Sequence, residues 1–154
     1  MRAILCVLLL SASGCRGEAP PTVASAKSLP DWKSAFEYVI EVEADAIRVR
    51  FSVADGFHVY SQGEAVGKPL QLQSAEDSAF LIEGVRYPEG VTKDLPIGRS
   101  VIVEGEGRVE ATLARREDAR DDRVRGVFRY QVCTDEACDR PRTDAFEVEP
   151  EPES

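Results

Sequence analysis

Histidine is almost missing from this chain, since His58 is the only one among 154 residues. A histidine-based metal site or a Ser-His-Asp triad has almost nothing to build on, so we expect no metal. We also expect no cofactor, because the hypothesis developed below assigns the chemistry to cysteine side chains. Basic residues are outnumbered, with 28 Asp and Glu against 19 Lys and Arg. Because no basic patch and no aromatic residues interleaved with Lys and Arg appear, we expect no nucleic-acid partner.

Cysteine is scarce as well: two of the four cysteines, Cys6 and Cys15, fall within the first fifteen residues. Residues 1–15 have the pattern of a bacterial signal peptide, with a positive charge at Arg2 and an apolar run over 3–10 too short to span a bilayer. Residues 12–15, Ala-Ser-Gly-Cys, resemble a lipobox, which predicts acylation of Cys15. The alternative is an ordinary secretory signal with an incidental cysteine.

The remaining chain divides by composition into a tether, one domain and a short tail. Residues 16–33 are rich in Ala, Pro, Ser and Gly without periodicity, which predicts a flexible tether. Residues 34–149 are enough for one domain with one core. Residues 150–154 are predicted to be disordered. No internal repeat is visible.

Alternating apolar and polar residues predict an all-β domain. Residues 36–42 and 47–53 alternate on either side of Ala44-Asp45, which predicts an antiparallel hairpin whose Glu and Arg side chains face each other. Asp55-Gly56 marks the next turn. Further strand candidates are residues 57–61, 79–85, 100–104, 108–114, 124–132 and 143–148. Seven or eight short strands favour an immunoglobulin-like antiparallel β-sandwich. The densely charged residues 113–123 lack an apolar stripe, so we interpret them as a solvated hairpin connection and not a helix.

Cys133 and Cys138 stand at the end of a strand-like run, separated by residues 134–137. A return of the chain over 143–148 would bring the two sulfurs within bonding distance. A disulfide around so small a loop stabilises a fold by only about 2 kcal/mol in the chain-entropy model. The spacing alone leaves two interpretations open, a structural staple and a redox-active pair.

Three segments carry a resemblance to a known family. Residues 130–138, YQVCTDEAC, with Pro141 soon after, resemble the active-site signature of the N-terminal periplasmic domain of DsbD-type thiol:disulfide interchange proteins. Residues 55–61, DGFHVYS, are similar to a strand of that family, and residues 87–90, YPEG, to one of its turns. The resemblance covers roughly residues 33–149, in the family's order and spacing.

The resemblance implies an immunoglobulin-like sandwich whose Cys133 and Cys138 cycle between dithiol and disulfide, with Cys138 forming the mixed disulfide. It implies a thioredoxin-like or membrane electron donor, and periplasmic disulfide proteins as acceptors. The chain would then be a stand-alone module in the periplasm, held to a membrane only by its lipid anchor. Arg16 after Cys15 favours the outer membrane. The runner-up interpretation is an envelope binding or assembly module with a structural disulfide.

Several other side chains are predicted neighbours of the cysteine pair. Tyr130 belongs to the cysteine signature, and His58 and Tyr60 share one face of the strand at 57–61. The alternatives are a half-buried strand histidine and a packed tyrosine with a surface hydroxyl. The family's protective cap loop carries an acidic pair and aromatics, whereas residues 93–98 here read KDLPIG, which leaves Leu95 or Ile97 to shield the sulfurs. Asp139-Arg140 also departs from the family's aromatic-proline pair.

Overall fold

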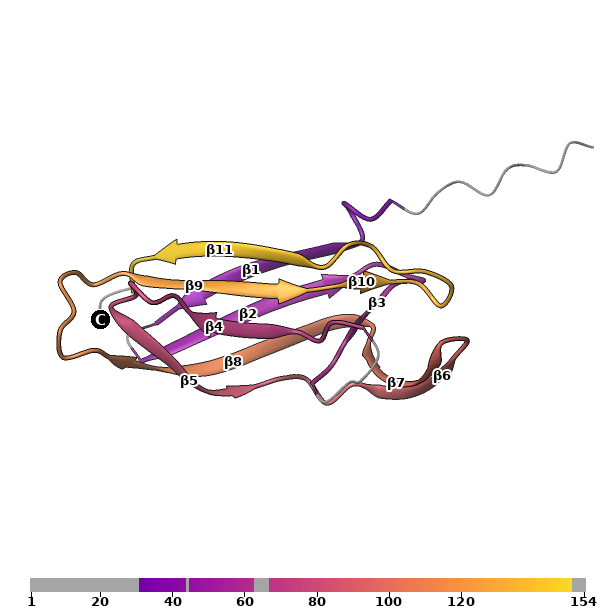
Figure 1. Cartoon of the computed structure of the whole chain (residues 1–154), viewed down its shortest axis with the longest axis horizontal. Coiled ribbons are helices and arrows are strands. Elements are labelled where there is room, and N and C mark those ends of the chain that lie inside the picture. Colours follow the sequence, from indigo (N-terminus) through magenta and orange to yellow (C-terminus); the bar gives the residue numbers. More distant parts are fainter. Residues whose placement is uncertain (1–30, 44, 63–66, 151–154) are drawn as a thin grey trace, which may run out of the picture.

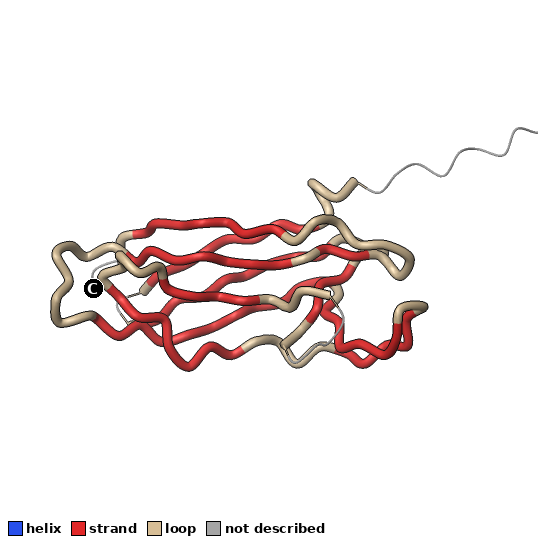
Figure 2. Tube along the Cα trace, viewed as in Figure 1, coloured by secondary structure: helices blue, strands red, loops and turns tan. Residues whose placement is uncertain are grey.

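The computed structural model describes residues 31–43, 45–62 and 67–150. The predicted signal peptide, the lipidation site at Cys15, most of the tether and the tail after residue 150 lie outside these ranges. Within them the chain forms strands, turns and loops only (Figure 2), so the described part contains no helix long and apolar enough to cross a membrane.

The described residues form eleven strands, and all paired strands run antiparallel. They are β1 Phe36–Val42, β2 Ala46–Val53, β3 His58–Tyr60, β4 Gln71–Ser74, β5 Phe80–Arg86, β6 Val91–Leu95, β7 Gly98–Val103, β8 Gly105–Arg115, β9 Val124–Tyr130, β10 Val132–Cys133 and β11 Arg142–Val148. The sheets have the orders β1-β2-β8-β5, β11-β9-β4 and β10-β3-β7-β6. The first two form the layers of the sandwich, and the third continues it at one end (Figure 1). The prediction of an all-β, immunoglobulin-like sandwich is confirmed.

The first hairpin forms where the alternation predicted it. Phe36 pairs with Val53 at one end of the β1–β2 register and Val42 with Ile47 at the other. Arg50 forms an ion pair with Glu41 across the two strands, and Arg48 with Glu43 beside the turn. The expected facing of Glu and Arg is therefore confirmed. Val39 is the one apolar residue of β1 on this face, and it is exposed.

Aromatic side chains join the two layers of the sandwich. The ring of Phe36 on β1 lies 4.5 Å from Tyr130 of β9 and 5.3 Å from Phe51 of β2, measured between centroids. Phe128, also on β9, is fully buried. Because β9 runs through this core and continues into β10, the packing fixes the direction in which the chain reaches Cys133.

Three features differ from the sequence-based expectation. Strands β4 and β6 were not predicted, because their sequences, QLQS and VTKDL, are largely polar. Tyr130 and Val132 belong to two strands, β9 and β10, which pair in different sheets. The connection after β8 is not a hairpin, since it leads to β9 in another sheet. Arg125 helps to fix that connection by binding Asp121 within it and Glu147 on β11.

Candidate redox site

The two cysteines are bonded at the end of the sandwich where β10 finishes. Cys133 and Cys138 form a disulfide with an S–S distance of 2.02 Å, and their backbones also form an isolated antiparallel bridge. The Thr134 amide donates to the Ala137 carbonyl at 2.7 Å, and the Thr134 hydroxyl accepts from the Ala137 amide at 3.2 Å. These short-range bonds close the loop of residues 134–137, so the tight turn itself brings the sulfurs together. The return of the chain as β11, paired with β9, is as expected.

The two cysteines have opposite exposure. Cys133 is 0% exposed, whereas Cys138 is an exposed residue. Thiol–disulfide exchange requires a thiolate to reach one sulfur along the S–S axis while the other sulfur leaves. Of the two residues, only Cys138 lies at the surface.

Tyr60 lies against both ends of the disulfide. It is fully buried, packs in one cluster with Leu95, Ile102 and Cys133, and its hydroxyl lies 3.8 Å from the Cys138 Sγ. A disulfide sulfur carries no hydrogen, so the hydroxyl is the donor in this weak contact. The structure thus brings Tyr60 to the sulfurs. The ring is packed, but its hydroxyl is buried and not at the surface as in the alternative interpretation.

His58 is the cross-strand partner of Cys133 in the β3–β10 register. It is 1% exposed, more deeply buried than the half-buried histidine of the alternative interpretation. Its ring lies 5.4 Å from that of Tyr60, and its Nδ1 lies 3.9 Å from an Asp135 carboxylate oxygen. Burial lowers the pKa of His58, an effect that Asp135 partly opposes.

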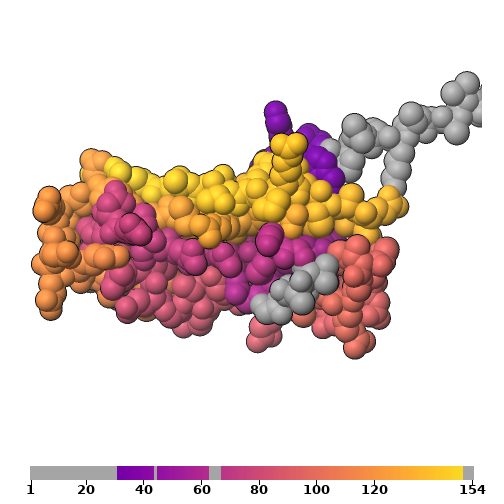
Figure 3. All heavy atoms as spheres, in the orientation of Figure 1, coloured from indigo at the N-terminus to yellow at the C-terminus, as the bar shows by residue number. Residues whose placement is uncertain are grey.

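The hairpin formed by β6 and β7 lies beside the cysteine loop at the same end of the molecule (Figures 1 and 3). Lys93 of β6 donates to Asp135 at 3.1 Å and to Glu104 at 3.2 Å. The hydrogen bond to Asp135 is the largest cause that raises the pKa of Lys93. One side chain therefore ties the hairpin to the loop between the two cysteines.

The two predicted shielding residues have different environments. Leu95, at the end of β6, is 8% exposed and packs in the cluster that contains Cys133. Ile97, in the turn between β6 and β7, is 52% exposed. Leu95 thus packs with the buried cysteine, while Ile97 stays at the surface.

Tyr130 is held in the core next to the site. Its hydroxyl donates to the Asp144 carboxylate at 3.0 Å, and Tyr38 donates to the same oxygen at 2.8 Å. Burial, followed by the hydrogen bond to Asp144, raises the pKa of Tyr130 to about 12. Its contacts hold the end of β9, the strand that leads into the cysteine segment.

The charges around the disulfide are largely paired with each other. Arg142 binds Asp139 at 2.6 Å and lowers the pKa of that carboxyl, while Lys93 binds Asp135. Opposite charges that neutralise each other pairwise leave little net field on the sulfurs.

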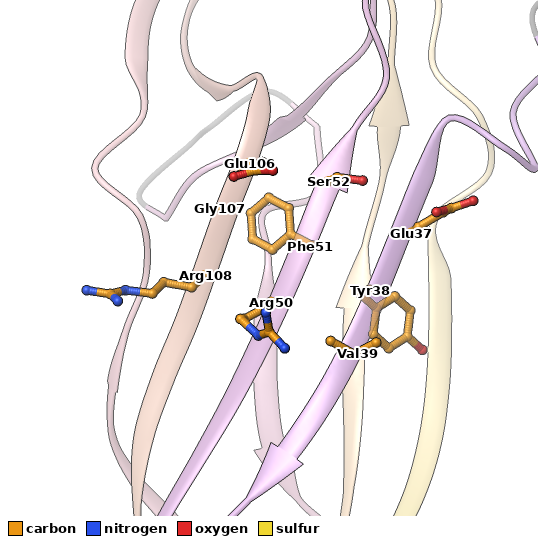
Figure 4. A pocket seen from close by; sticks show the side chains of 9 residues that line it. All are labelled: Glu37, Tyr38, Val39, Arg50, Phe51, Ser52, Glu106, Gly107 and Arg108. Atoms are coloured by element: carbon orange, nitrogen blue, oxygen red, sulfur yellow. The ribbon is translucent and has the colours of Figure 1, made fainter.

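A surface hollow lies elsewhere, across β1, β2 and β8 (Figure 4). Arg50, Arg108 and Glu106 are among its lining residues, and the Phe51 ring lies over Gly107, where a Cβ atom would approach it to 2.3 Å. Neither cysteine lines this hollow. It offers no sulfur chemistry.

The sequence singled out Cys133, Cys138, His58, Tyr60 and Leu95, which the fold brings to one end of the sandwich. It did not single out Ile102 or the pairing of Lys93 with Asp135. The two paired residues are 42 positions apart in the chain, and their opposite charges resemble many other surface charges. Only the position of β6 in space reveals the contact.

Comparison with known proteins gives one family. The family model described as "Thiol:disulfide interchange protein DsbD, N-terminal" matches residues 25–150. Among solved structures, the DsbD N-terminal domain of Neisseria meningitidis in the reduced form is similar, at 26% identity and a TM-score of 0.60, with 79% of this chain and 89% of that chain covered. The complex of the DsbD N-terminal and PilB N-terminal domains from the same organism is similar in fold, at 20% identity, a TM-score of 0.57, and 79% and 88% coverage. No curated protein matches the chain.

Proposed function

Because the chain belongs to the family of N-terminal domains of the thiol:disulfide interchange protein DsbD, we propose that it relays reducing equivalents to partner proteins of the cell envelope. Its general chemistry is thiol–disulfide exchange, as the family and the Cys133–Cys138 bond together indicate. The proposal concerns the finer steps: which sulfur reacts, with whom, and where.

The difference in exposure between the cysteines is the observation that carries the proposed mechanism. In the reduced domain the Cys138 thiolate attacks a partner disulfide, which forms a mixed disulfide and releases one partner thiolate. Cys133 then loses its proton and attacks the Cys138 sulfur, which releases the second partner thiolate and re-forms the Cys133–Cys138 bond. The partner gains two electrons and the domain loses two. Buried Cys133 suits the second, intramolecular attack, and exposed Cys138 suits the first.

The proposed partners are proteins that present a disulfide or dithiol of their own. In the Neisseria meningitidis complex, a DsbD N-terminal domain is bound to a PilB N-terminal domain. By analogy, a thioredoxin-like or membrane donor would reduce this domain, and envelope disulfide proteins would accept its electrons. Pairing of the charges around the sulfurs supports a partner that must dock, because small thiols gain no electrostatic help there.

The proposed setting is the periplasm, with the domain on a tether. A signal peptide over 1–15, acylation of Cys15 and a flexible segment over 16–33 would hold the domain at a membrane surface, with the outer membrane favoured by Arg16. Such a tether would let the domain move over the membrane surface to meet partners.

Single-cysteine variants test the proposed order of attack. Reduced Cys133→Ser protein is mixed with the oxidised form of a purified thioredoxin-like protein, and Cys138→Ser protein is the matched control. We expect the Cys133→Ser variant to accumulate a mixed disulfide on a non-reducing gel, and the control to form little, because its one thiol is buried. Equal trapping by both variants would contradict the assignment of Cys138, and trapping by neither would favour a structural staple.

A further inference from the structure

His58 and Cys133 are cross-strand partners, which places a titratable side chain and the buried sulfur on one face of the sheet. Both residues are buried, and antiparallel partners have Cβ atoms about 5 Å apart on the same face of the sheet. The other ring nitrogen of His58, Nε2, is buried and has no hydrogen-bond partner among the described residues. A buried polar atom without a partner costs free energy, so its retention calls for an explanation.

The explanation we favour is that the partner of His58 appears when the disulfide is reduced. In the disulfide, Cys133 Sγ carries no proton and is at best a weak acceptor. In the dithiol it carries an S–H group, and in the exchange step it carries a full charge inside a site that is closed to water. An imidazole beside it could accept that proton and later return it.

We propose that His58 exchanges a proton with Cys133 during the redox cycle. This inference rests on the proposed function, because it describes the second step of the same exchange. When Cys138 is joined to a partner, the Cys133 S–H gives its proton to neutral His58, and the thiolate attacks Cys138 Sγ. The Cys138–partner bond breaks, the partner leaves as a thiolate, and the imidazolium releases its proton to solvent. In the reverse direction a partner thiolate attacks Cys138 Sγ, and the His58 imidazolium protonates the Cys133 thiolate that is released.

The groups that face His58 fit this role. Burial holds the pKa of His58 below its ordinary value of 6.5, so the ring is neutral at pH 7 and can accept a proton. Asp135 is exposed, and its carboxylate oxygen lies 3.9 Å from Nδ1 of His58. The carboxylate stabilises the imidazolium once it forms and gives its proton a route to solvent. Lys93 opposes that charge and Glu104 favours it, while the Tyr60 ring holds the imidazole edge-on.

The test separates the two chemical steps with Ellman's reagent. Reduced protein, purified without a histidine tag, is mixed with excess reagent, and release of its coloured thiolate is followed. The first equivalent comes from attack by a cysteine on the reagent and depends on reagent concentration. The second comes from attack by the other cysteine within the protein and does not. We expect His58→Gln and His58→Phe to slow the second phase about 10²-fold at pH 7 and to leave the first within about two-fold.

The dependence of the second-phase rate on pH, compared with the titration of His58, distinguishes a proton-exchange role from simple packing. In the wild type, the second-phase rate should rise with pH and level off above the pKa of His58, which NMR gives directly because the chain has one histidine. That pKa should also differ between the oxidised and reduced forms. These wild-type readouts hold even where a variant fails to fold.

The outcomes also separate this inference from the proposed function. Two equivalents in two phases, with the second phase unchanged in either variant, would overturn the role of His58 and leave the exchange mechanism standing. A second-phase rate that follows a thiol titration instead of the His58 titration would overturn it as well. Release of no second equivalent would count against the exchange function itself.

Discussion

Leu95 offers the sharpest test of whether the hairpin β6–β7 protects the disulfide. Its side chain packs in the cluster with Cys133, Tyr60 and Ile102, while Ile97 in the turn of the same hairpin is exposed. Reduction by a small thiol requires Cys133 to leave as a thiolate, a charge that water stabilises best when the hairpin opens. Loosening the hairpin should therefore speed reduction, and Leu95→Ala loosens it where Ile97→Ala does not.

The magnitude follows from the packing. Leu→Ala removes three carbons, and about 0.8 kcal/mol per buried carbon gives roughly 2 kcal/mol, the low end of the range for buried leucines. The low end applies because Leu95 lies at the edge of the molecule, where neighbours can relax. If this loss of free energy destabilises only the closed position of the hairpin, the fraction of molecules with an open hairpin rises about 30-fold.

The assay is the rate of reduction by dithiothreitol, read by alkylation of the released thiols and gel shift. We expect Leu95→Ala to be reduced up to about 30-fold faster than the wild type, and Ile97→Ala to stay within about two-fold. Thermal unfolding of the oxidised variants shows how much of the loss is global. Equal reduction rates for the two variants would refute the idea that the buried leucine of this hairpin protects the disulfide.

Three further predictions concern the supports of the site. Asp144→Ala leaves the hydroxyls of Tyr38 and Tyr130 without their shared acceptor and should cost about 1–3 kcal/mol in urea unfolding, against little change for the exposed control Glu89→Ala. Because burial lowers the pKa of folded His58, the unfolded chain binds that proton more tightly. The unfolding free energy should thus drop as pH falls from about 6.5 through the lower folded pKa, and His58→Gln should remove that drop; an unchanged slope would contradict it. Gly67→Ala would place a Cβ atom 2.2 Å from the Tyr60 ring, at a backbone φ of +83°. The control Gly56→Ala has nearly the same φ, +82°, but open space around the added Cβ, so Gly67→Ala should lower the free energy of unfolding more. Equal losses of unfolding free energy in the two variants would contradict the packing of Tyr60 against Gly67.

The sequence predicted the fold where alternation was strong. The strands β1 and β2 alternate around a short turn, with Val39 as the exception, and their hairpin was placed correctly. The strand β9 carries Phe128 and Tyr130 on one parity and was also found, but the predicted strand ran on into what is β10. Strand β4 has one buried apolar residue, Leu72, and depends on β9 for its hydrogen bonds. Its strand conformation is set by tertiary pairing, which local sequence does not record.

The site was predictable where it uses residue types that are rare in the chain. Two cysteines in the domain and one histidine stand out by scarcity, and the common parity of His58 and Tyr60 placed them on one face. The depth of burial of His58 and the role of Lys93 were not predictable. Both depend on how hairpin β6–β7 lies against the cysteine loop, a contact between segments about 40 residues apart.

The reduction potential of the Cys133–Cys138 bond tests the central claim most directly. Purified protein is equilibrated with dithiothreitol and glutathione buffers, the thiols are counted after acid quenching and alkylation, and far-UV circular dichroism follows the fold. The account predicts a midpoint within about −120 to −270 mV, the range of exchange proteins, with the sandwich intact when reduced. A midpoint below about −300 mV, or unfolding on reduction, would contradict it and identify the disulfide as a structural staple.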